Sequence, residues 1–458
     1  MNENLFFDEI VYHIYPYGMC DCLRHNDFLS YASSNIELLE KELPKIKKKG
    51  FTTILIGPLC ESFFHGYDTV DYFQIDRRLG TTEMMKSFSK TAHDLGMKVV
   101  IDMVFNHSGR LFFAFKDIQR NKEKSPYVSW YNIDFSRNSE FNDGFDYEGW
   151  QGCKDLVKFN LKNIDTQNYL LDALKYWIET FDIDGLRIDA AHLMDSSFLK
   201  KLTSFTKNIK SDFWVLGEVI HEIYSSFIAE SNIDSCTDYQ LYEHFHNCFN
   251  QNDFNILGYE LERQFGKNGI YKNNSLYIFA DNQDVNRVAS NLIDAQQLIP
   301  LYIILFSLPG IPSVYYGSEF GIKGKRTPYN DMDLRISIPP FSMFIPQWAY
   351  PDINPKLLEK TIEILCNIRK KSKALIHQNF EIIKVTRSFL CFKRWFEDEV
   401  VILGINIGNE TEYLDVGYQT MFDAFSGELF SINNGIFAFD CNEIYLMSNK
   451  KQEEINEV

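Results

Sequence analysis

The sequence lacks an excess of positive charge. Its 458 residues include 46 Lys and Arg against 63 Asp and Glu, which gives a formal net charge of −17 at pH 7. An acidic surface repels nucleic acids and anionic membranes, so we expect neither as a partner. A neutral small-molecule substrate is more compatible with this charge.

Long apolar runs are also missing. The apolar stretch Leu298–Leu308 is too short to cross a bilayer and contains Pro300, so it predicts a buried helix. Met1–Leu5 shows neither a basic region nor a long apolar run, which predicts that there is no signal peptide. The nine Cys are scattered without a metal-binding spacing. We interpret them as reduced thiols of a cytoplasmic protein.

What the sequence does contain is material for a large core. Hydrophobic residues make up 45% of the chain, and the length allows two or three domains. Aromatic residues reach 15%. Most of these rings must be core, but a high aromatic content also suits stacking on sugar rings.

Short apolar strands alternate with amphipathic helices along most of the chain, which predicts parallel βαβ units. The predicted strands are Ile10–Tyr15, Thr53–Ile56, Lys98–Asp102, Gly185–Asp189, Phe213–Glu218, Cys236–Tyr239, Ser275–Phe279 and Ile311–Tyr316. The predicted helices include Ile36–Lys48, Glu83–Leu95, Gln167–Thr180, Ser197–Ile209 and Pro355–Lys371. Eight such units predict a (β/α)₈ TIM barrel in the α/β class.

Two segments interrupt this alternation. Residues 108–165 are polar, with no clear helix in their second half, and predict an inserted loop domain after the third strand. Residues 375–458 show alternating strands separated by glycine-containing turns, which predicts an all-β sandwich. The barrel is therefore expected to comprise residues 1–107 and 166–374.

Carboxylates follow several of the predicted strands. TIM barrels place catalytic groups at the carboxyl ends of their strands. Asp189 and Glu218 lie one βα unit apart, and adjacent strands are ~4.8 Å apart, so the two side chains can face each other. Retaining glycosidases need a carboxyl separation of ~5–5.5 Å. Arg187 points to the same side as Asp189 and should favour its ionised form. A structural ion pair is the alternative interpretation.

Four ordered motifs identify a resemblance. They are Asp102–His107 (DMVFNH), Gly185–Asp189 (GLRID), Gly217–Val219 (GEV) and Phe279–Asp284 (FADNQD). Together they resemble the α-amylase family, glycoside hydrolase family 13. The resemblance implies that Asp189 is the nucleophile, Glu218 the general acid/base and Asp284 the stabiliser of the transition state. It also implies substrate-binding or supporting roles for Tyr67, Asp102, His107, Arg187, His192 and Gln283.

Three further matches resemble the neopullulanase, cyclomaltodextrinase and maltogenic amylase branch. They are Tyr67–Tyr72 (YDTVDY), Leu156–Asn160 (LVKFN) and Gly217–Glu222 (GEVIHE). This resemblance implies cleavage of α-1,4 bonds in maltooligosaccharides or cyclodextrins, with α-1,6 cleavage or glycosyl transfer in some members. We expect the chain to lack the N-terminal domain of that branch, and its oligomeric state stays open. Gln283 stands where the family has His.

Other interpretations remain open at this point. A 4-α-glucanotransferase would use the same residues, with a sugar hydroxyl in place of water. A non-catalytic carbohydrate-binding relative is a second alternative, although the intact Asp189, Glu218 and Asp284 argue against it. Tyr67 and His107 could be core residues, and His192 could be structural.

The sequence gives little support for a metal. Asn106 matches a calcium ligand of the family, but the inserted segment lacks an Asp-rich loop. A hard cation requires six or more oxygen ligands. We therefore predict no cofactor and no metal site.

Overall fold

The computed structural model describes residues 6–327, 330–338 and 354–451. Eight parallel strands close into a barrel in the order β1-β15-β14-β13-β12-β11-β5-β2. Their bounds are β1 Val11–Ile14, β2 Thr53–Ile56, β5 Lys98–Met103, β11 Gly185–Ile188, β12 Trp214–Gly217, β13 Ser235–Thr237, β14 Ser275–Phe279 and β15 Ile311–Tyr315. The predicted TIM barrel is thus confirmed, including its short sixth strand.

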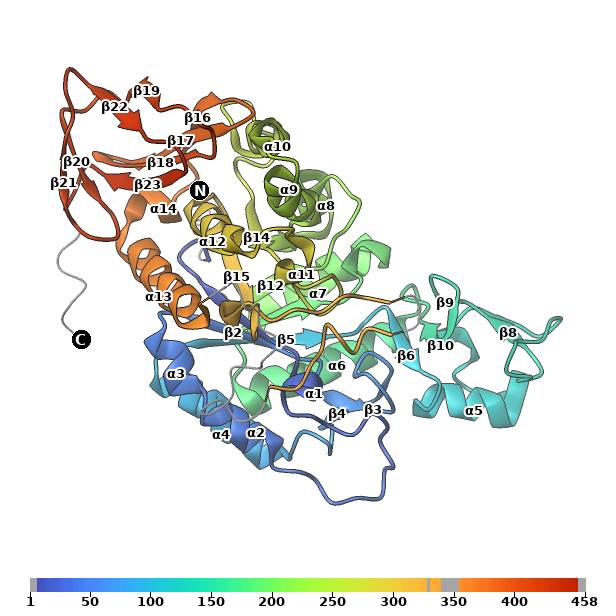
Figure 1. Ribbon diagram of the computed structural model, residues 1–458. Helices are drawn as coiled ribbons and strands as arrows, with labels where there is room; N and C mark the ends of the chain where they lie inside the picture. The colour runs from blue at the N-terminus through green and yellow to red at the C-terminus, as the bar shows by residue number, and fades with distance from the viewer. Residues whose placement is uncertain (1–5, 328–329, 339–353, 452–458) are drawn as a thin grey trace.

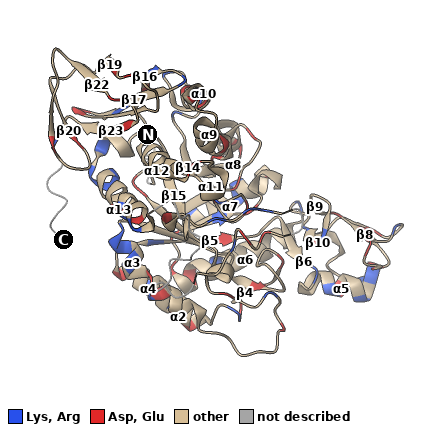
Figure 2. Ribbon diagram, in the orientation of Figure 1, with Lys and Arg blue, Asp and Glu red and all other residues tan. Residues whose placement is uncertain are grey.

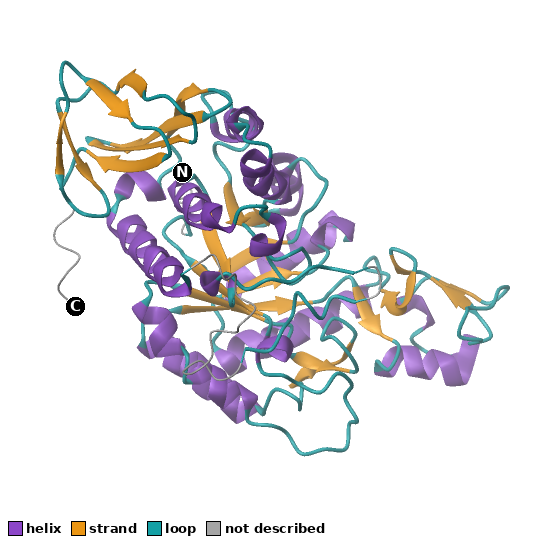
Figure 3. Ribbon diagram, viewed as in Figure 1, coloured by secondary structure: helices purple, strands orange, loops and turns teal. Residues whose placement is uncertain are grey.

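Helices surround the barrel (Figures 1 and 3). They are α1 Pro16–Met19, α2 Asn35–Glu40, α3 Leu43–Lys48, α4 Thr82–Asp94, α6 Ile164–Phe181, α7 Ser196–Ile209, α8 Tyr224–Ser231, α9 Tyr239–Asn250, α10 Phe254–Phe265, α11 Val288–Asn291, α12 Leu298–Ser307, α13 Pro355–Lys371 and α14 Lys373–Ile376. No helix in residues 6–327, 330–338 and 354–451 is both long enough and apolar enough for a membrane span. Figure 2 shows Lys and Arg gathered on α3, with acidic residues spread over other elements.

One predicted helix is divided in two. The pattern at Ile36–Lys48 predicts a continuous helix, but α2 ends at Glu40 and α3 begins at Leu43. Pro44 lies in the first turn of α3, where a missing backbone N–H is tolerated. In the middle of one long helix the same proline would remove a hydrogen bond, so the prediction of a single helix was wrong.

The segment between β5 and α6 projects from the barrel (Figure 1). It contains β6 His107–Gly109, α5 Phe113–Asn121, β7 Ile133–Asp134, β8 Asp146–Tyr147, β9 Gly149–Trp150 and β10 Cys153–Lys158. Strand β10 pairs antiparallel with both β6 and β9. This pairing brings Trp150 and Leu156 towards the mouth of the barrel, where both line a pocket.

The C-terminal part is all-β. A six-stranded sheet has the order β16-β17-β18-β23-β20-β21, and β19 pairs with β22. The bounds are β16 Phe380–Val385, β17 Phe389–Phe396, β18 Glu399–Asn406, β19 Glu412–Asp415, β20 Thr420–Asp423, β21 Leu429–Ser431, β22 Ile436–Phe439 and β23 Glu443–Ser448. A buried core that includes Phe389, Met421 and Phe439 lies between these sheets. The exact domain boundaries stay predictions.

One further antiparallel pair of strands lies next to the site described below. Strands β3 (Cys60–Ser62) and β4 (Thr69–Ile75) form a hairpin after β2. The hairpin loop carries His65 and Tyr67, both of which line the pocket described below. The sequence pattern did not predict this hairpin, because its strands are short and irregularly paired.

Candidate active site

The parallel register brings Asp189 and Glu218 together. Ile188 on β11 is the register partner of Gly217 on β12, so the next residue of each strand is one of these carboxylates. The backbone N–H of Glu218 donates to the carbonyl of Ile188 at 2.9 Å. Asp189 and Glu218 therefore leave neighbouring strands at the same height, as the predicted βα spacing requires.

A single buried cation joins the acidic side chains. Arg187, on β11, is 2% exposed. Its Nη1 lies 2.7 Å from Asp102 Oδ2 and 3.4 Å from Asp189 Oδ1. Its Nη2 lies 2.7 Å from Glu218 Oε1 and 3.9 Å from Asp284 Oδ2. Arg187 thus contacts these four carboxylates, and its shortest contacts are with Asp102 and Glu218 rather than Asp189.

Burial dominates the electrostatics of these acids. The pKa of Asp189 is raised well above its usual value, first because burial removes water from the carboxylate and second because Glu218 repels it. Arg187 opposes both effects but does not outweigh them. Burial likewise raises the pKa of Asp102 to about 6. Arg187 therefore favours the ionised form of Asp189, as predicted, but burial and Glu218 outweigh it and the net pKa shift is upward.

Glu218 lies close enough to Asp189 to repel its negative charge, which favours a proton on Asp189. Retaining glycoside hydrolysis needs an ionised nucleophile, a state that Arg187 favours and burial opposes at Asp189.

Glu218 is held by donors on both oxygens. Its Oε2 accepts the backbone N–H of Ala190 at 2.8 Å, and its Oε1 accepts the hydroxyl of Tyr239 at 3.1 Å. Ala190 has φ 48°, a left-handed conformation that is uncommon for a non-glycine residue. The sequence reasoning missed Tyr239, although it lies at the end of the predicted sixth strand, where site residues are expected.

One amide connects the two sides of the site. Asn282 Nδ2 donates to the Tyr239 hydroxyl at 3.0 Å, so that hydroxyl donates its own hydrogen to Glu218. Asn282 Oδ1 accepts the backbone N–H groups of Asp284 at 2.8 Å and Val285 at 3.2 Å. The turn that presents Asp284 is therefore fixed by the same residue that orients Tyr239.

Asp284 is also held by two side chains. Arg335 Nη2 lies 2.9 Å from Asp284 Oδ1, and Gln283 Nε2 donates to Asp284 Oδ2 at 2.7 Å. Gln283 is fully buried and donates a second hydrogen bond, of 3.0 Å, to the hydroxyl of Tyr67. Because a carboxylate only accepts, the amide nitrogen of Gln283 must face Asp284. Arg335 follows β15 by a long loop and was not predicted.

The predicted site residues form two groups: those that line the cavity and those that lie behind its lining. A cavity of about 880 Å³ is lined by six of them: Tyr67, His107, Asp189, His192, Glu218 and Asp284. Asp102, Arg187 and Gln283 are absent from this lining and lie behind it. We therefore expect Gln283 to act through Tyr67 and Asp284 and not by a direct hydrogen bond to a sugar, which is the supporting one of the roles implied by the resemblance.

His107 presents a donor to this cavity. Burial lowers the pKa of His107 to about 3, so the ring is neutral at physiological pH. Asn106 Nδ2 lies 3.2 Å from His107 Nδ1, which assigns the hydrogen to Nε2. Nε2 is buried and has no hydrogen-bond partner in the described part of the chain. A sugar hydroxyl would satisfy it.

The comparisons with known proteins decide the family. The family model described as "Alpha amylase, catalytic domain" matches residues 36–337. The chain belongs to the alpha-amylase family. Among curated relatives, it is 25% identical over 436 residues to the maltogenic alpha-amylase of Bacillus acidopullulyticus, covering 90% of this chain and 70% of the relative. It is 27% identical over 401 residues to the cyclomaltodextrinase of Thermoanaerobacter pseudethanolicus, covering 84% and 65%.

Solved structures agree on the fold. A cyclomaltodextrinase superposes with a TM-score of 0.83 at 23% identity, covering 96% of this chain and 78% of the other. The cyclic alpha-maltosyl-(1-->6)-maltose hydrolase from Arthrobacter globiformis gives 0.80 at 20% identity, covering 98% and 100%. The predicted family and its maltogenic amylase, cyclomaltodextrinase and neopullulanase relatives are confirmed. The chain spans about two thirds of the length of the first curated relatives.

Members of this family can carry calcium, and the donor set here does not fit it. Asn106 Oδ1 is a buried acceptor without a partner in the described residues. The neighbouring acids of the projecting segment are occupied by cations: Asp143 by Arg110 at 2.9 Å and Asp146 by Lys154 at 2.7 Å. Across the described ranges, no cluster of three or more His, Cys, Asp or Glu could hold a metal. One amide oxygen is too little for a hard cation.

We therefore predict that hydrolysis persists in EDTA. The structural reason is that the guanidinium of Arg110 and the ammonium of Lys154, and not a metal ion, neutralise Asp143 and Asp146. The measurement is the rate of maltoheptaose cleavage after exhaustive dialysis against EDTA. Inactivation that added calcium reverses would contradict the prediction.

Proposed function

We propose that this protein is a retaining glycoside hydrolase that cleaves α-1,4-glucosidic bonds in maltooligosaccharides or cyclodextrins. Asp189 and Glu218 lie at the ends of adjacent strands, both form ion pairs with Arg187, and both line one cavity. This placement is the observation that carries the proposal. The names of the relatives, maltogenic amylase and cyclomaltodextrinase, support the substrate class.

The proposed reaction has two displacements. Asp189 attacks the anomeric carbon while Glu218 gives its proton to the departing glycosidic oxygen, which forms a glycosyl-enzyme ester. Glu218, now a carboxylate, takes a proton from water, and the resulting hydroxide displaces Asp189. Asp284 lies where a carboxylate can stabilise the positive charge of the oxocarbenium-like transition state. Arg335 and Gln283 fix its two oxygens.

Two displacements at one carbon retain its configuration, so we expect the α-anomer as the first product. Proton NMR during the first minutes of reaction with maltoheptaose, β-cyclodextrin and pullulan would show it and would also rank the substrates. Products longer than the substrate would indicate glucanotransferase activity. A β-anomer as the first product would contradict the double displacement.

Tyr239 offers a separate test of Glu218 as the acid/base. Its hydroxyl stabilises the ionised carboxylate of Glu218. In Tyr239→Phe, we expect kcat/KM for maltoheptaose to fall about tenfold, because Glu218 loses one of its hydrogen-bond donors. Tyr131→Phe is the control, because Tyr131 is a buried tyrosine whose hydroxyl bonds only to Ser108 among the described residues. An unchanged kcat/KM in Tyr239→Phe would argue against this role of Tyr239.

We also propose a cytoplasmic location. All nine Cys are free thiols, two of them, Cys153 and Cys441, on the surface. Exposed free thiols are typical of a reducing compartment. A relative that is 25% identical over 408 residues carries the name intracellular maltogenic amylase of Bacillus subtilis.

A further inference from the structure

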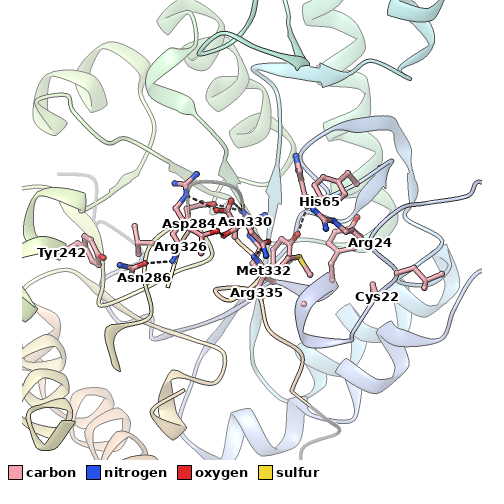
Figure 4. Close-up of a pocket in the computed structure, with 18 residues that line it drawn as sticks. Cys22, Arg24, His65, Tyr242, Asp284, Asn286, Arg326, Asn330, Met332 and Arg335 are labelled. Carbon is pink, nitrogen blue, oxygen red and sulfur yellow. Dashed lines mark hydrogen bonds and ion pairs between the residues drawn. The ribbon is translucent and has the colours of Figure 1, made fainter. Parts of the chain in front are cut away.

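Asp284 has a partner from a distant part of the chain, and that partner must itself be held in place. Arg335 donates from Nη2 to Asp284 Oδ1 at 2.9 Å and from Nε to the carbonyl of Gln283 at 3.1 Å. Asp284 and Arg335 both line the pocket drawn in Figure 4, where they lie beside each other. Residues 331–338, around Arg335, form neither helix nor strand. Such a segment orients a side chain only where other groups hold its backbone.

The peptide bond that precedes Arg335 is bound by a buried arginine. The Nε of Arg287 donates to the carbonyl of Leu334 at 3.1 Å. This carbonyl belongs to the same peptide group as the backbone N–H of Arg335. The hydroxyl of Tyr315 donates to the same carbonyl oxygen at 3.3 Å. Arg287 and Tyr315 therefore fix the backbone from which the Arg335 side chain leaves.

Arg287 also binds two other segments of the chain. Its Nη1 donates to the carbonyl of Tyr316 at 2.5 Å and to Ser318 Oγ at 3.3 Å, just after the end of β15. Its backbone N–H donates to the carbonyl of Gly324 at 3.0 Å. The side chain is 0% exposed, so water does not compete for these bonds. Because Arg287 follows Asp284 by three residues, it joins the turn that presents Asp284 to the loop after β15.

The surroundings of Arg287 suit a guanidinium and not merely a side chain of its size. The ring centres of Tyr315 and Tyr316 lie 4.2 and 4.9 Å from its guanidinium carbon. The hydroxyl of Ser318 accepts from Arg287 and donates to Asp281 Oδ2 at 2.7 Å, which links the cation to an acid. Burying a charge is costly, and an apolar residue could fill the same space without that cost. Only the forked donors of an arginine, however, reach several carbonyls at once.

We propose that Arg287 is a positioning residue, which holds Arg335 in the orientation that keeps Asp284 in place. This role rests on the proposed function, in which Asp284 stabilises the transition state. An interaction that acts in the transition state affects kcat and not the binding of the substrate. Loss of Arg287 should therefore lower kcat and leave KM nearly unchanged.

Arg287→Lys is the first test, because lysine keeps the charge but lacks the planar fork that reaches both Leu334 and Tyr316. We expect kcat on maltoheptaose to fall about tenfold and KM to stay within about twofold of the parent value. Arg394→Lys is the matched control: Arg394 is also 0% exposed and donates to backbone carbonyls, but it lies on β17 in the C-terminal sheet. The control should keep the parent kcat per folded molecule. An unchanged kcat in Arg287→Lys, or an equal loss in the control, would overturn the proposal.

A double-mutant cycle tests whether Arg287 acts through Arg335. In an Arg335→Ala background, Arg287→Lys should lower kcat by less than about twofold, because the side chain that it positions is already gone. The same loss of about tenfold in both backgrounds would show a general weakening of the fold and would contradict the proposal. If Arg287→Lys does not fold, Tyr315→Phe removes the other donor to the Leu334 carbonyl. Its loss of kcat, about threefold, should likewise disappear in the Arg335→Ala background.

A crystal structure of Arg287→Lys separates this proposal from the proposed function. The distance between Arg335 Nη2 and Asp284 Oδ1 is 2.9 Å in the parent protein. We expect it to exceed about 4 Å in the variant, which is the usual limit of an ion pair. An intact pair would rule out the positioning role, whatever the activity. A broken pair in the variant of a protein that hydrolyses no glucan would overturn the proposed function and leave the positioning role standing.

Discussion

Asp189→Asn is expected to remove glucan hydrolysis almost completely, with a loss on the order of 10⁴-fold or more. The amide cannot form the glycosyl ester, so the two-step route is closed. The variant should also fold. Burial raises the pKa of Asp189, so the folded state keeps this proton at a pH where the unfolded chain has released it. Stability from this carboxyl therefore falls as pH rises above the usual range for Asp.

Asn removes that pH-dependent cost, because it never ionises. We expect Asp189→Asn to unfold at the same temperature as the parent protein near pH 4, and at the same or a higher temperature at pH 7. Asp184→Asn, at the other end of β11 and bound to His93 and Lys210, is the matched control and should keep its turnover per folded molecule. Turnover by pure Asp189→Asn within about tenfold of the parent rate would contradict the assignment of the nucleophile.

Arg187→Met is expected to have the largest effect on stability, with a loss of about 3–5 kcal/mol at pH 7. The substitution keeps the length of the side chain but leaves Asp102, Asp189 and Glu218 buried without their shared cation. Protonation relieves this repulsion. The folded carboxyls then bind protons at a higher pH than the unfolded ones, so the loss should shrink as the pH falls from 7 to 5.

Urea denaturation of both proteins at pH 5 and pH 7 measures this difference. Arg137→Met provides the control, because Arg137 is exposed and its nearest acid, Asp146, is 3.7 Å away. Such an exposed pair contributes less than about 1 kcal/mol. A deficit for Arg187→Met that stays constant between the two pH values would show that the carboxylates are not what Arg187 neutralises.

The barrel could be predicted because each strand is a short apolar run between amphipathic helices. The catalytic acids could be predicted because parallel strands end at the same edge of the sheet, which the register of Ile188 with Gly217 reproduces. The break at Pro44 was missed because the apolar spacing continues across it. The correct predictions and this wrong one all rest on the local spacing of apolar and polar residues along the chain.

The supporting residues depend on contacts that no local pattern encodes. Arg335 meets Asp284 only because a long loop after β15 folds back over the barrel mouth. Gln283 is adjacent in sequence to Asp284, but this adjacency does not show that its side chain lies behind the cavity lining. That position follows from the burial of its amide between Tyr67 and Asp284. The effect of Arg187 on Asp189 was predicted, but the upward net pKa shift was not, because spacing shows the nearby cation and not the depth of burial.

The central claim is that Asp189 forms a covalent bond to the sugar. Incubation with a fluorinated glycosyl fluoride, which forms the ester quickly and releases it slowly, followed by digestion and mass spectrometry, tests it most directly. We predict one labelled peptide that contains Gly185–Ala191, with the glycosyl group on Asp189. A label on Glu218 or Asp284, or turnover of the reagent without any covalent adduct, would contradict the account.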